Sequence, residues 1–351
     1  MSTGDFPPSA FGGPAENPWM RLTARSPRLR RFGPWVPSIG SLVLGLLTLV
    51  VFRRGLPHVG WIVGYLLLLW LLVVVLAELR APLEQRGRHL VLDAGEYAIQ
   101  TLYHNLLLFV LPAYYASATL TSANVLFLAG LAAAALLTAM DPWYRRLVHP
   151  RPLLQHLLLG FSVFAALNVA LALVGIPPIL AVEGSAALAM MALTPAFRRQ
   201  GPGGSTRAYV KAALLAGFAM LAVGYGRALV PPAPLFLAQA VAARTVTERE
   251  PVDVIHGSIP AATVAEWGEL AAYTAVYAPS GLRQPIEHRW SKNGEQFARI
   301  PLSPVRGGRA EGFRTYSTTR NLTPPLEGRY TVDVVTASGQ IIGRVRFTLT
   351  P

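Results

Sequence analysis

The chain has 351 residues, of which 52% are apolar and only 14% are charged, and its formal net charge is +13. A soluble globular protein carries about 25% charged residues, so this composition indicates a protein that is largely embedded in a membrane. The absence of cysteine excludes disulfides, thiolate catalysis and cysteine-based metal or iron–sulfur sites.

The positive charge does not indicate a nucleic-acid partner. Residues 1–243 hold 18 basic and 8 acidic residues, whereas residues 244–351 hold 13 and 10. The C-terminal part also shows no basic face with interleaved aromatic residues. We therefore assign the excess charge to loops beside a membrane and expect no nucleic acid.

Residues 1–33 are predicted to form a disordered, cytoplasmic tail, since they are rich in Pro, Gly, Ser and Arg and lack apolar periodicity. The tail ends in a basic cluster of Arg21, Arg25, Arg28, Arg30 and Arg31. No small-residue cleavage site follows the first apolar run, which ends at Arg53-Arg54, so we expect an uncleaved first helix.

Residues 34–232 are predicted to form a helical membrane domain with about seven spans. Each of seven apolar segments has 18 or more residues, which is enough to cross about 30 Å of hydrocarbon. The segments are 36–53, 57–78, 98–117, 122–140, 153–175, 178–196 and 209–231. Whether 178–196, which contains Glu183, crosses fully is left open.

The charges of the connections predict the orientation. The tail and the loops at 79–97, 141–152 and 197–211 together carry 15 basic residues, and on the opposite side only Arg53 and Arg54 occur. Positive-inside bias then places the N-terminus in the cytoplasm. With seven crossings, the C-terminal domain lies in the periplasm of a bacterium, and the protein belongs to the inner membrane.

Residues 233–247 are predicted to be a juxtamembrane linker, either a surface helix or a first strand. From 248 to 351 the sequence predicts an all-β, Ig-like sandwich. Asn293-Gly294 indicates a type I′ hairpin turn, and alternating stretches predict strands at 269–278, 285–292, 296–302, 312–319, 328–337 and 340–349.

One face of the third span carries a polar stripe, because Asp93, Glu96, Gln100 and His104 follow one another at steps of three and four. Ionisable groups inside a membrane indicate a proton or substrate path. The alternative is an amphipathic entry to the bundle in which His104 is hydrogen-bonded inside.

Glu183 and Arg227 are predicted to lie at one depth, about 6–8 Å inside the outer ends of their spans. An ion pair between them would relieve the cost of burying each charge. We interpret this pair as a structural clamp, with a transport site as the alternative.

On the β-domain, Glu287, Arg289, Arg299 and Arg314 could form a charged patch near aromatic residues. A binding face for a partner or an anionic glycan is one interpretation, and a solvated sheet face over an aromatic core is the other. The candidate surface consists of Arg289, Trp290, Arg299, Arg314 and Tyr316. No motif for catalysis, nucleotide binding or metal ligation occurs.

Several motifs of the C-terminal part resemble a bacterial domain of unknown function that usually ends membrane-anchored proteins. They are Arg249-Glu250-Pro251-Val252-Asp253, His288-Arg289-Trp290, Gly312-Phe313-Arg314-Thr315-Tyr316-Ser317, Gly328-Arg329-Tyr330-Thr331-Val332, Gly339-Gln340, Gly343 and Phe347. The stretch Phe109-Val110-Leu111-Pro112-Ala113-Tyr114-Tyr115 resembles the multi-pass domain that often precedes it. The resemblance implies an inner-membrane protein with an exported C-terminal module, and it implies no catalytic role.

We therefore expect a non-enzymatic membrane protein whose periplasmic β-domain binds a partner protein or an envelope glycan, with the lipid bilayer as its surroundings. The alternative is a small-molecule or proton-coupled transporter that uses the polar stripe. A membrane-embedded enzyme ranks third, and no cofactor or metal is expected.

Overall fold

The computed structural model describes residues 59–199, 204–320 and 322–351. The predicted tail and the first apolar segment, 36–53, lie outside these residues. The chain divides into two compact units. The first holds the described residues up to Pro112, together with Ala129–Leu167 and Gly184–Leu221; the second holds Ala113–Leu128, Asn168–Glu183 and Ala222–Pro351.

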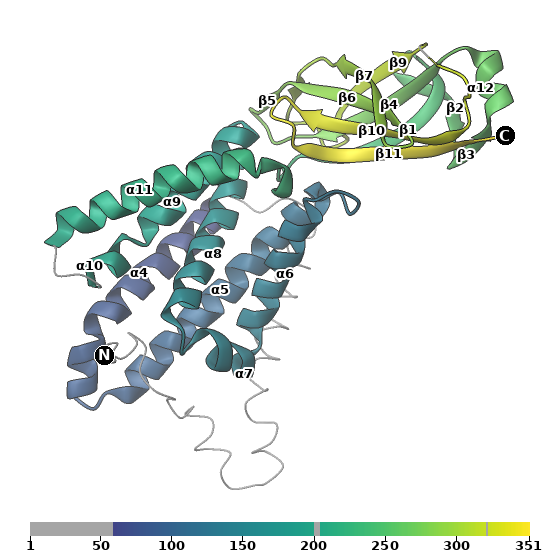
Figure 1. The fold of residues 1–351 in the computed structure, drawn as a ribbon. Helices are drawn as coiled ribbons and strands as arrows, with labels where there is room; N and C mark the ends of the chain where they lie inside the picture. Colours follow the sequence, from purple (N-terminus) through teal and green to yellow (C-terminus); the bar gives the residue numbers. More distant parts are fainter. Residues whose placement is uncertain (1–58, 200–203, 321) are drawn as a thin grey trace, which may run out of the picture. The chain divides into compact units, whose positions relative to one another are not determined.

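The described residues before residue 230 form helices and the connections between them (Figure 1). Its elements are α4 (Val59–Gln85), α5 (His89–Ser117), α6 (Val125–Ala139), α7 (Asp141–Trp143), the π-helix η1 (Tyr144–Val148), α8 (Pro152–Leu173), α9 (Pro178–Ala192), α10 (Thr194–Arg199), α11 (Gly204–Tyr225) and the 3₁₀ turn η2 (Arg227–Leu229). Local sequence explains several boundaries. Pro152 and Pro178 open helices, where a missing N–H costs nothing, and Gly175 follows α8 with a φ of +89°.

Four described stretches are long and apolar enough to cross a membrane: Trp61–Gln85, Pro152–Leu173, Pro178–Phe197 and Thr206–Tyr225. A fifth arises if Val125–Ala139 and Asp141–Val148, which are bent by 95°, form one span. Many of their apolar side chains face outward, since only 22% of the first stretch and 17% of the last are buried.

The described residues do not support the prediction of seven spans. The predicted segment 122–140 forms a helix of only 15 residues, because Met140 takes an extended backbone (φ −92°, ψ 95°) and Asp141-Pro142 begins a new direction. The predicted segment 98–117 lies in α5, a 29-residue helix whose polar residues keep it outside the apolar set.

The C-terminal part is all-β apart from one short helix, as predicted. Its elements are β1 (Phe236–Thr247), β2 (Glu250–Ile255), β3 (Ser258–Pro260), α12 (Ala261–Trp267), β4 (Leu270–Tyr277), β5 (Arg283–Gln284), β6 (Ile286–Lys292), β7 (Glu295–Pro301), β8 (Val305–Arg306), β9 (Phe313–Thr319), β10 (Gly328–Thr336) and β11 (Ile341–Thr350). The six predicted strands coincide with β4, β6, β7, β9, β10 and β11 within about two residues. Residues 236–247, whose sequence suits either a surface helix or a strand, form β1.

The strands form two main sheets with a shared core. One has the order β2-β1-β4-β9, the other β3-β11-β10-β6-β7, and β5 and β8 form a small separate pair. Side chains from both sheets meet in one cluster, which includes Leu270 on β4, Trp290 on β6 and Phe347 on β11. The register Tyr330↔Phe347 places two buried rings in a stack with centroids 5.2 Å apart.

The predicted hairpin turn is present. Asn293 and Gly294 join β6 to β7 with φ angles of 50° and 94°, the positive values that a type I′ turn requires. Asn293 also accepts a hydrogen bond from the backbone N–H of Arg329 at 2.9 Å, so the turn is tied to the start of β10. The turn therefore fixes the register of β6 against β7. The end of β7 and the residue after it, Ile300–Leu302, line a pocket of the β-domain.

Candidate functional site

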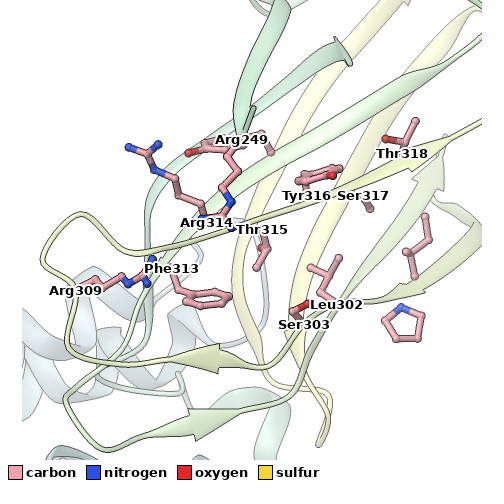
Figure 2. Close-up of a pocket in the computed structure, with 13 residues that line it drawn as sticks. Arg249, Leu302, Ser303, Arg309, Phe313, Arg314, Thr315, Tyr316, Ser317 and Thr318 are labelled. Atoms are coloured by element: carbon pink, nitrogen blue, oxygen red, sulfur yellow. The ribbon is translucent and has the colours of Figure 1, made fainter. Parts of the chain in front are cut away.

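A pocket of about 590 Å³ opens on the β-domain beside β9, the last strand of its sheet. All of β9 from Phe313 to Thr318 lines it, and the end of β7 with the following loop forms the opposite side (Figure 2). The remaining lining residues come from two turns and from β4. The full lining is Arg249, Tyr273, Ile300, Pro301, Leu302, Ser303, Arg309, Phe313, Arg314, Thr315, Tyr316, Ser317 and Thr318.

The charged residues of the lining are all basic. Arg314 lies on β9, Arg249 in the turn between β1 and β2, and Arg309 in the loop before β9 (Figure 2). The guanidinium of Arg309 lies over the ring of Phe313, 5.5 Å from its centroid. Three cations with no acidic residue in the lining make the pocket electropositive, which favours an anionic ligand.

One of these cations, Arg314, has an acidic partner, Glu250, which follows Arg249 in the chain. Arg314 Nη1 donates to Glu250 Oε1 at 2.7 Å, and both side chains are largely exposed, at 44% and 64%. An exposed ion pair stabilises a protein by less than about 1 kcal/mol. A ligand carboxylate or phosphate can therefore replace Glu250 at small cost.

Aromatic side chains add apolar contact area to the pocket. Tyr316 is 49% exposed, while Tyr273 is buried at its floor. Burial raises the pKa of Tyr273; Arg314 lowers it and Glu250 raises it further. Tyr273 is therefore a neutral phenol at physiological pH, and the positive charge of the pocket comes from the arginines alone.

The wall of the pocket is fixed by a buried polar network behind β9. Along this strand Arg314 and Tyr316 point outward, whereas Thr315 and Ser317 point inward and are buried. Ser317 Oγ accepts from Trp290 Nε1 at 2.9 Å and lies 2.8 Å from His288 Nδ1, and Thr315 Oγ1 lies 2.9 Å from Thr274 Oγ1. The strand is thus held in place with its outward residues in the pocket.

Only part of the predicted β-domain surface lies here. Arg314 and Tyr316 line the pocket, but Trp290 is fully buried in the core. Arg289 and Arg299 both bond the carboxylate of Glu287, Arg289 at 2.7 Å. Burial alone would raise the pKa of Glu287, yet the hydrogen bonds from these two arginines outweigh burial and lower it. The structure therefore divides the predicted patch into a pocket, a core residue and an ion cluster in which two arginines share the carboxylate of Glu287.

Sequence reasoning missed Arg249 and Arg309 as pocket residues. Arg249 lies far from Arg314 in the chain, and the pairing of β2, β1, β4 and β9 brings it to the same sheet. Arg309 lies in the loop just before β9, outside any predicted strand. Arg249 does belong to one of the motifs quoted above, and its φ of 66° at a two-residue turn is the local feature that aims it.

In the helical unit, the predicted polar stripe lies on α5 and contacts α6. Gln100 Nε2 donates to Thr138 O at 3.0 Å, and His104 Nδ1 lies 3.2 Å from Ala135 O. Both side chains are buried, as is Asp93. The last carbonyls of a helix lack partners within it, so Gln100 supplies a hydrogen bond at the end of α6.

Glu96, the fourth member of the stripe, joins three elements. Its carboxylate lies 3.3 Å from Arg80 Nη2 on α4 and 2.9 Å from His149 Nε2, just after η1. Sequence spacing gave no sign of the partnership with His149. These contacts of Glu96, Gln100 and His104 reach α4, α6 and the turn after η1, so the three residues contribute to the packing of the helices.

The predicted ion pair between Glu183 and Arg227 is not formed in the described structure. Helix α11 ends at Tyr225, so Arg227 lies beyond it in the turn η2. There Arg227 donates to the backbone oxygens of Gly224, at 2.7 Å, and Ser338. The prediction counted the depth of Arg227 from Pro231, which lies six residues beyond the end of α11.

Other contacts of the second unit surround this turn. Gln340 donates to Val230 O at 3.1 Å, Asn124 to Ile341 O at 3.3 Å, and Arg344 to Thr121 O at 3.0 Å. Arg344 also bonds the carboxylate of Asp333, and this hydrogen bond raises its pKa. The hairpin between β10 and β11 thus has several polar partners within its unit. Among the described residues, no group of three His, Asp or Glu side chains is placed to hold a metal ion.

Comparison with known proteins gives two matches to family models. A model described as a family of unknown function, DUF5924, matches residues 17–271, and one described as a protein of unknown function, DUF2914, matches residues 283–349. No curated protein matches the chain. These results agree with the expectation of two uncharacterised domains in one chain, and the second match includes β9 with Arg314 and Tyr316.

Proposed function

The chain belongs to the DUF5924 family of unknown function, and from that premise we propose that it is a membrane protein whose C-terminal β-domain binds an anionic ligand in the basic pocket. The observation that carries this proposal is the convergence of Arg249, Arg309 and Arg314 on one pocket with no acidic residue in its lining. The partner is a protein or an envelope glycan that bears negative charge.

Membrane insertion is the first part of the proposal. It is supported by four or five apolar helical stretches with outward-facing apolar side chains, such as Leu214 and Phe218 on α11, which are 71% and 70% exposed. An apolar face of this kind is stable in contact with lipid tails but not in contact with water. The inner membrane as location and an Ig-like sandwich are retained as parts of the proposal.

Orientation is the second part: N-terminus in the cytoplasm and β-domain in the periplasm, following the positive-inside bias of the loops. Alkaline phosphatase fused after Pro351 should be active, and green fluorescent protein at the same position dark. The reverse pattern would place the β-domain in the cytoplasm and overturn this part.

Ligand binding is the third part, and it is tested on the full-length chain in detergent. The probes are polyglutamate and polygalacturonate, two anionic polymers with different backbones. We expect at least one polymer to bind with an affinity that falls as the salt concentration rises. The double variant Arg314→Gln, Arg309→Gln should weaken the binding of this polymer at least tenfold.

The matched control is Arg329→Gln with Arg346→Gln, which removes two exposed arginines on β10 and β11 outside the pocket. This variant should bind like the wild type. Equal weakening by the control and the pocket variants would show that net charge, and not the pocket, attracts the polymer, and the site would be rejected.

Transport through the polar stripe is not proposed. Gln100 and His104 lie against backbone carbonyls of α6, and Glu96 is paired with Arg80 and His149. These contacts tie the stripe into the packing of the helices.

A further inference from the structure

We infer that the ligand of the basic pocket is an extended acidic peptide segment that adds a strand to the free edge of β9. The inference rests on the proposed function, since it uses the same pocket, and it goes further by naming the class of partner and the way in which its backbone is held.

The first observation is the position of β9 in its sheet. It is the terminal strand of the order β2-β1-β4-β9 and pairs with β4 on one side only. In an antiparallel strand, alternate residues direct their N–H and C=O groups to the same side. On the side away from β4, β9 therefore presents a row of backbone donors and acceptors, which is a template for another strand.

The second observation is that the pocket follows this edge. Six consecutive residues, Phe313–Thr318, line the pocket, so the strand itself forms one wall. The opposite side is formed by Ile300–Ser303, which comprises the end of β7 and the start of the loop after it, and β7 is the terminal strand of the other sheet. The pocket is thus elongated along a strand, which suits an extended chain better than a compact ligand.

The third observation is the distribution of side chains about the edge. Arg314 and Tyr316 occupy the outward face of β9, whereas partly buried Ile300, Leu302 and Phe313 pack at the inner side, against the cores. Side chains of an added strand alternate between these two sides. The complementary sequence therefore alternates acidic residues, facing Arg314 and Arg249, with apolar residues that face the gap between the sheets.

A glycan is the competing partner. Sugar acids would meet the arginines and stack on Tyr316, but their rings do not repeat amide donors and acceptors at strand spacing. The unpaired backbone of β9 would then remain without a partner. A peptide satisfies both the arginines and the backbone edge, which is why we favour it.

The test uses the full-length chain in detergent and the peptide acetyl-Glu-Val-Glu-Val-Glu-Val-Glu-Val-amide. Two further peptides carry the same number of N-methyl groups, placed either on all glutamates or on all valines. In a strand, N–H groups of alternate residues point to the same edge. One methylated peptide should therefore lose at least tenfold in affinity, while the other binds like the parent.

A second readout is hydrogen exchange of the protein. Binding of the parent peptide should slow exchange in the segment 313–319, because amides at the free edge become hydrogen-bonded. The peptide that retains its edge N–H groups should protect this segment as well, and the other should not.

The remaining outcomes separate the two proposals. Equal binding of both methylated peptides would overturn strand addition and leave an anion-binding pocket. Binding of polygalacturonate without the parent peptide would overturn the peptide partner and favour a glycan. If neither the peptides nor the polymers bind, this inference and the proposed function both fail.

Discussion

His288 on β6 and Ser317 on β9 are joined by a buried contact of 2.8 Å between Nδ1 and Oγ, which crosses from one sheet of the β-domain to the other. His288 Nε2 reaches Thr274 Oγ1 at 3.1 Å, so both ring nitrogens have hydroxyl partners. The histidine has no exposed surface, and burial lowers its pKa to about 4. A neutral histidine thus holds the strand that lines the basic pocket.

The low pKa of His288 predicts acid sensitivity of the β-domain. Between the unfolded pKa of 6.5 and the folded pKa of about 4, the unfolded chain binds a proton that the folded chain does not. Stability is therefore full above pH 6.5, falls as the pH drops toward 4, and by this group alone loses about 2 kcal/mol between pH 7 and pH 5.

The measurement is the free energy of opening of the segments 286–292 and 313–319 at both pH values, from hydrogen exchange of the full-length chain in denaturant. His288→Gln should reduce the difference between the two pH values, and His256→Gln, at an exposed site, should leave it unchanged. An unaltered pH response in His288→Gln would mean that other groups cause it.

Ser317→Ala should destabilise the β-domain by about 1–3 kcal/mol, since the indole N–H of Trp290 and one ring nitrogen of His288 lose their partner in a buried place. Thr318→Ala removes a hydroxyl from the neighbouring position and should change stability by less than about 0.5 kcal/mol. Denaturant unfolding of the two variants provides the comparison. Equal stabilities would show that the serine bridge contributes little.

Gly343 on β11 leaves room for Leu237 on β1. A Cβ at position 343 would lie 2.3 Å from Leu237 Cδ1 and 2.6 Å from its Cγ. Gly343→Ala should therefore cost about 1–3 kcal/mol through overpacking. The double variant Gly343→Ala with Leu237→Ala lacks these atoms. Its loss of stability should therefore be smaller than the sum of the losses measured for the two single variants. Additive costs would show that the backbone, and not Leu237, restricts this position.

Gln100 should stabilise the helical part of the chain through the end of α6. Gln100→Leu removes the donor to Thr138 O and should lower stability by about 1–3 kcal/mol. Thr101→Ala is the control, because the Thr101 hydroxyl bonds only a carbonyl of its own helix, that of Tyr97. Thermal unfolding in detergent distinguishes them. A Gln100→Leu protein as stable as the control would speak against a packing role for the stripe.

The sequence predicted those parts of the fold that depend on local patterns. Six strands and the Asn293-Gly294 turn follow from alternation and turn chemistry. The sequence was ambiguous for β1, because an apolar run such as Phe236–Thr247 suits a helix or a strand equally well. It was wrong for the end of α11, where Gly226 and η2 stop the helix before Arg227.

The pocket could be predicted only in part, because it depends on strand order. Arg314 and Tyr316 were predicted to belong to a candidate surface of the β-domain, but nothing local indicates that β9 ends its sheet or that Arg249 lies beside it. Trp290 looked like a surface residue next to Arg289. Its side chain points inward, on the face of β6 opposite to Arg289, and the buried ring of Phe347 packs edge-on against it.

The open edge of β9 also bears on how copies of the protein behave when they are crowded together. Unprotected sheet edges are where identical chains join into aggregates. Two copies meeting edge to edge at β9 would bring two sets of the same three guanidinium groups together, and like charges oppose such pairing. The arginines thus disfavour pairing between the β9 edges of two copies, while an acidic strand can still pair with this edge.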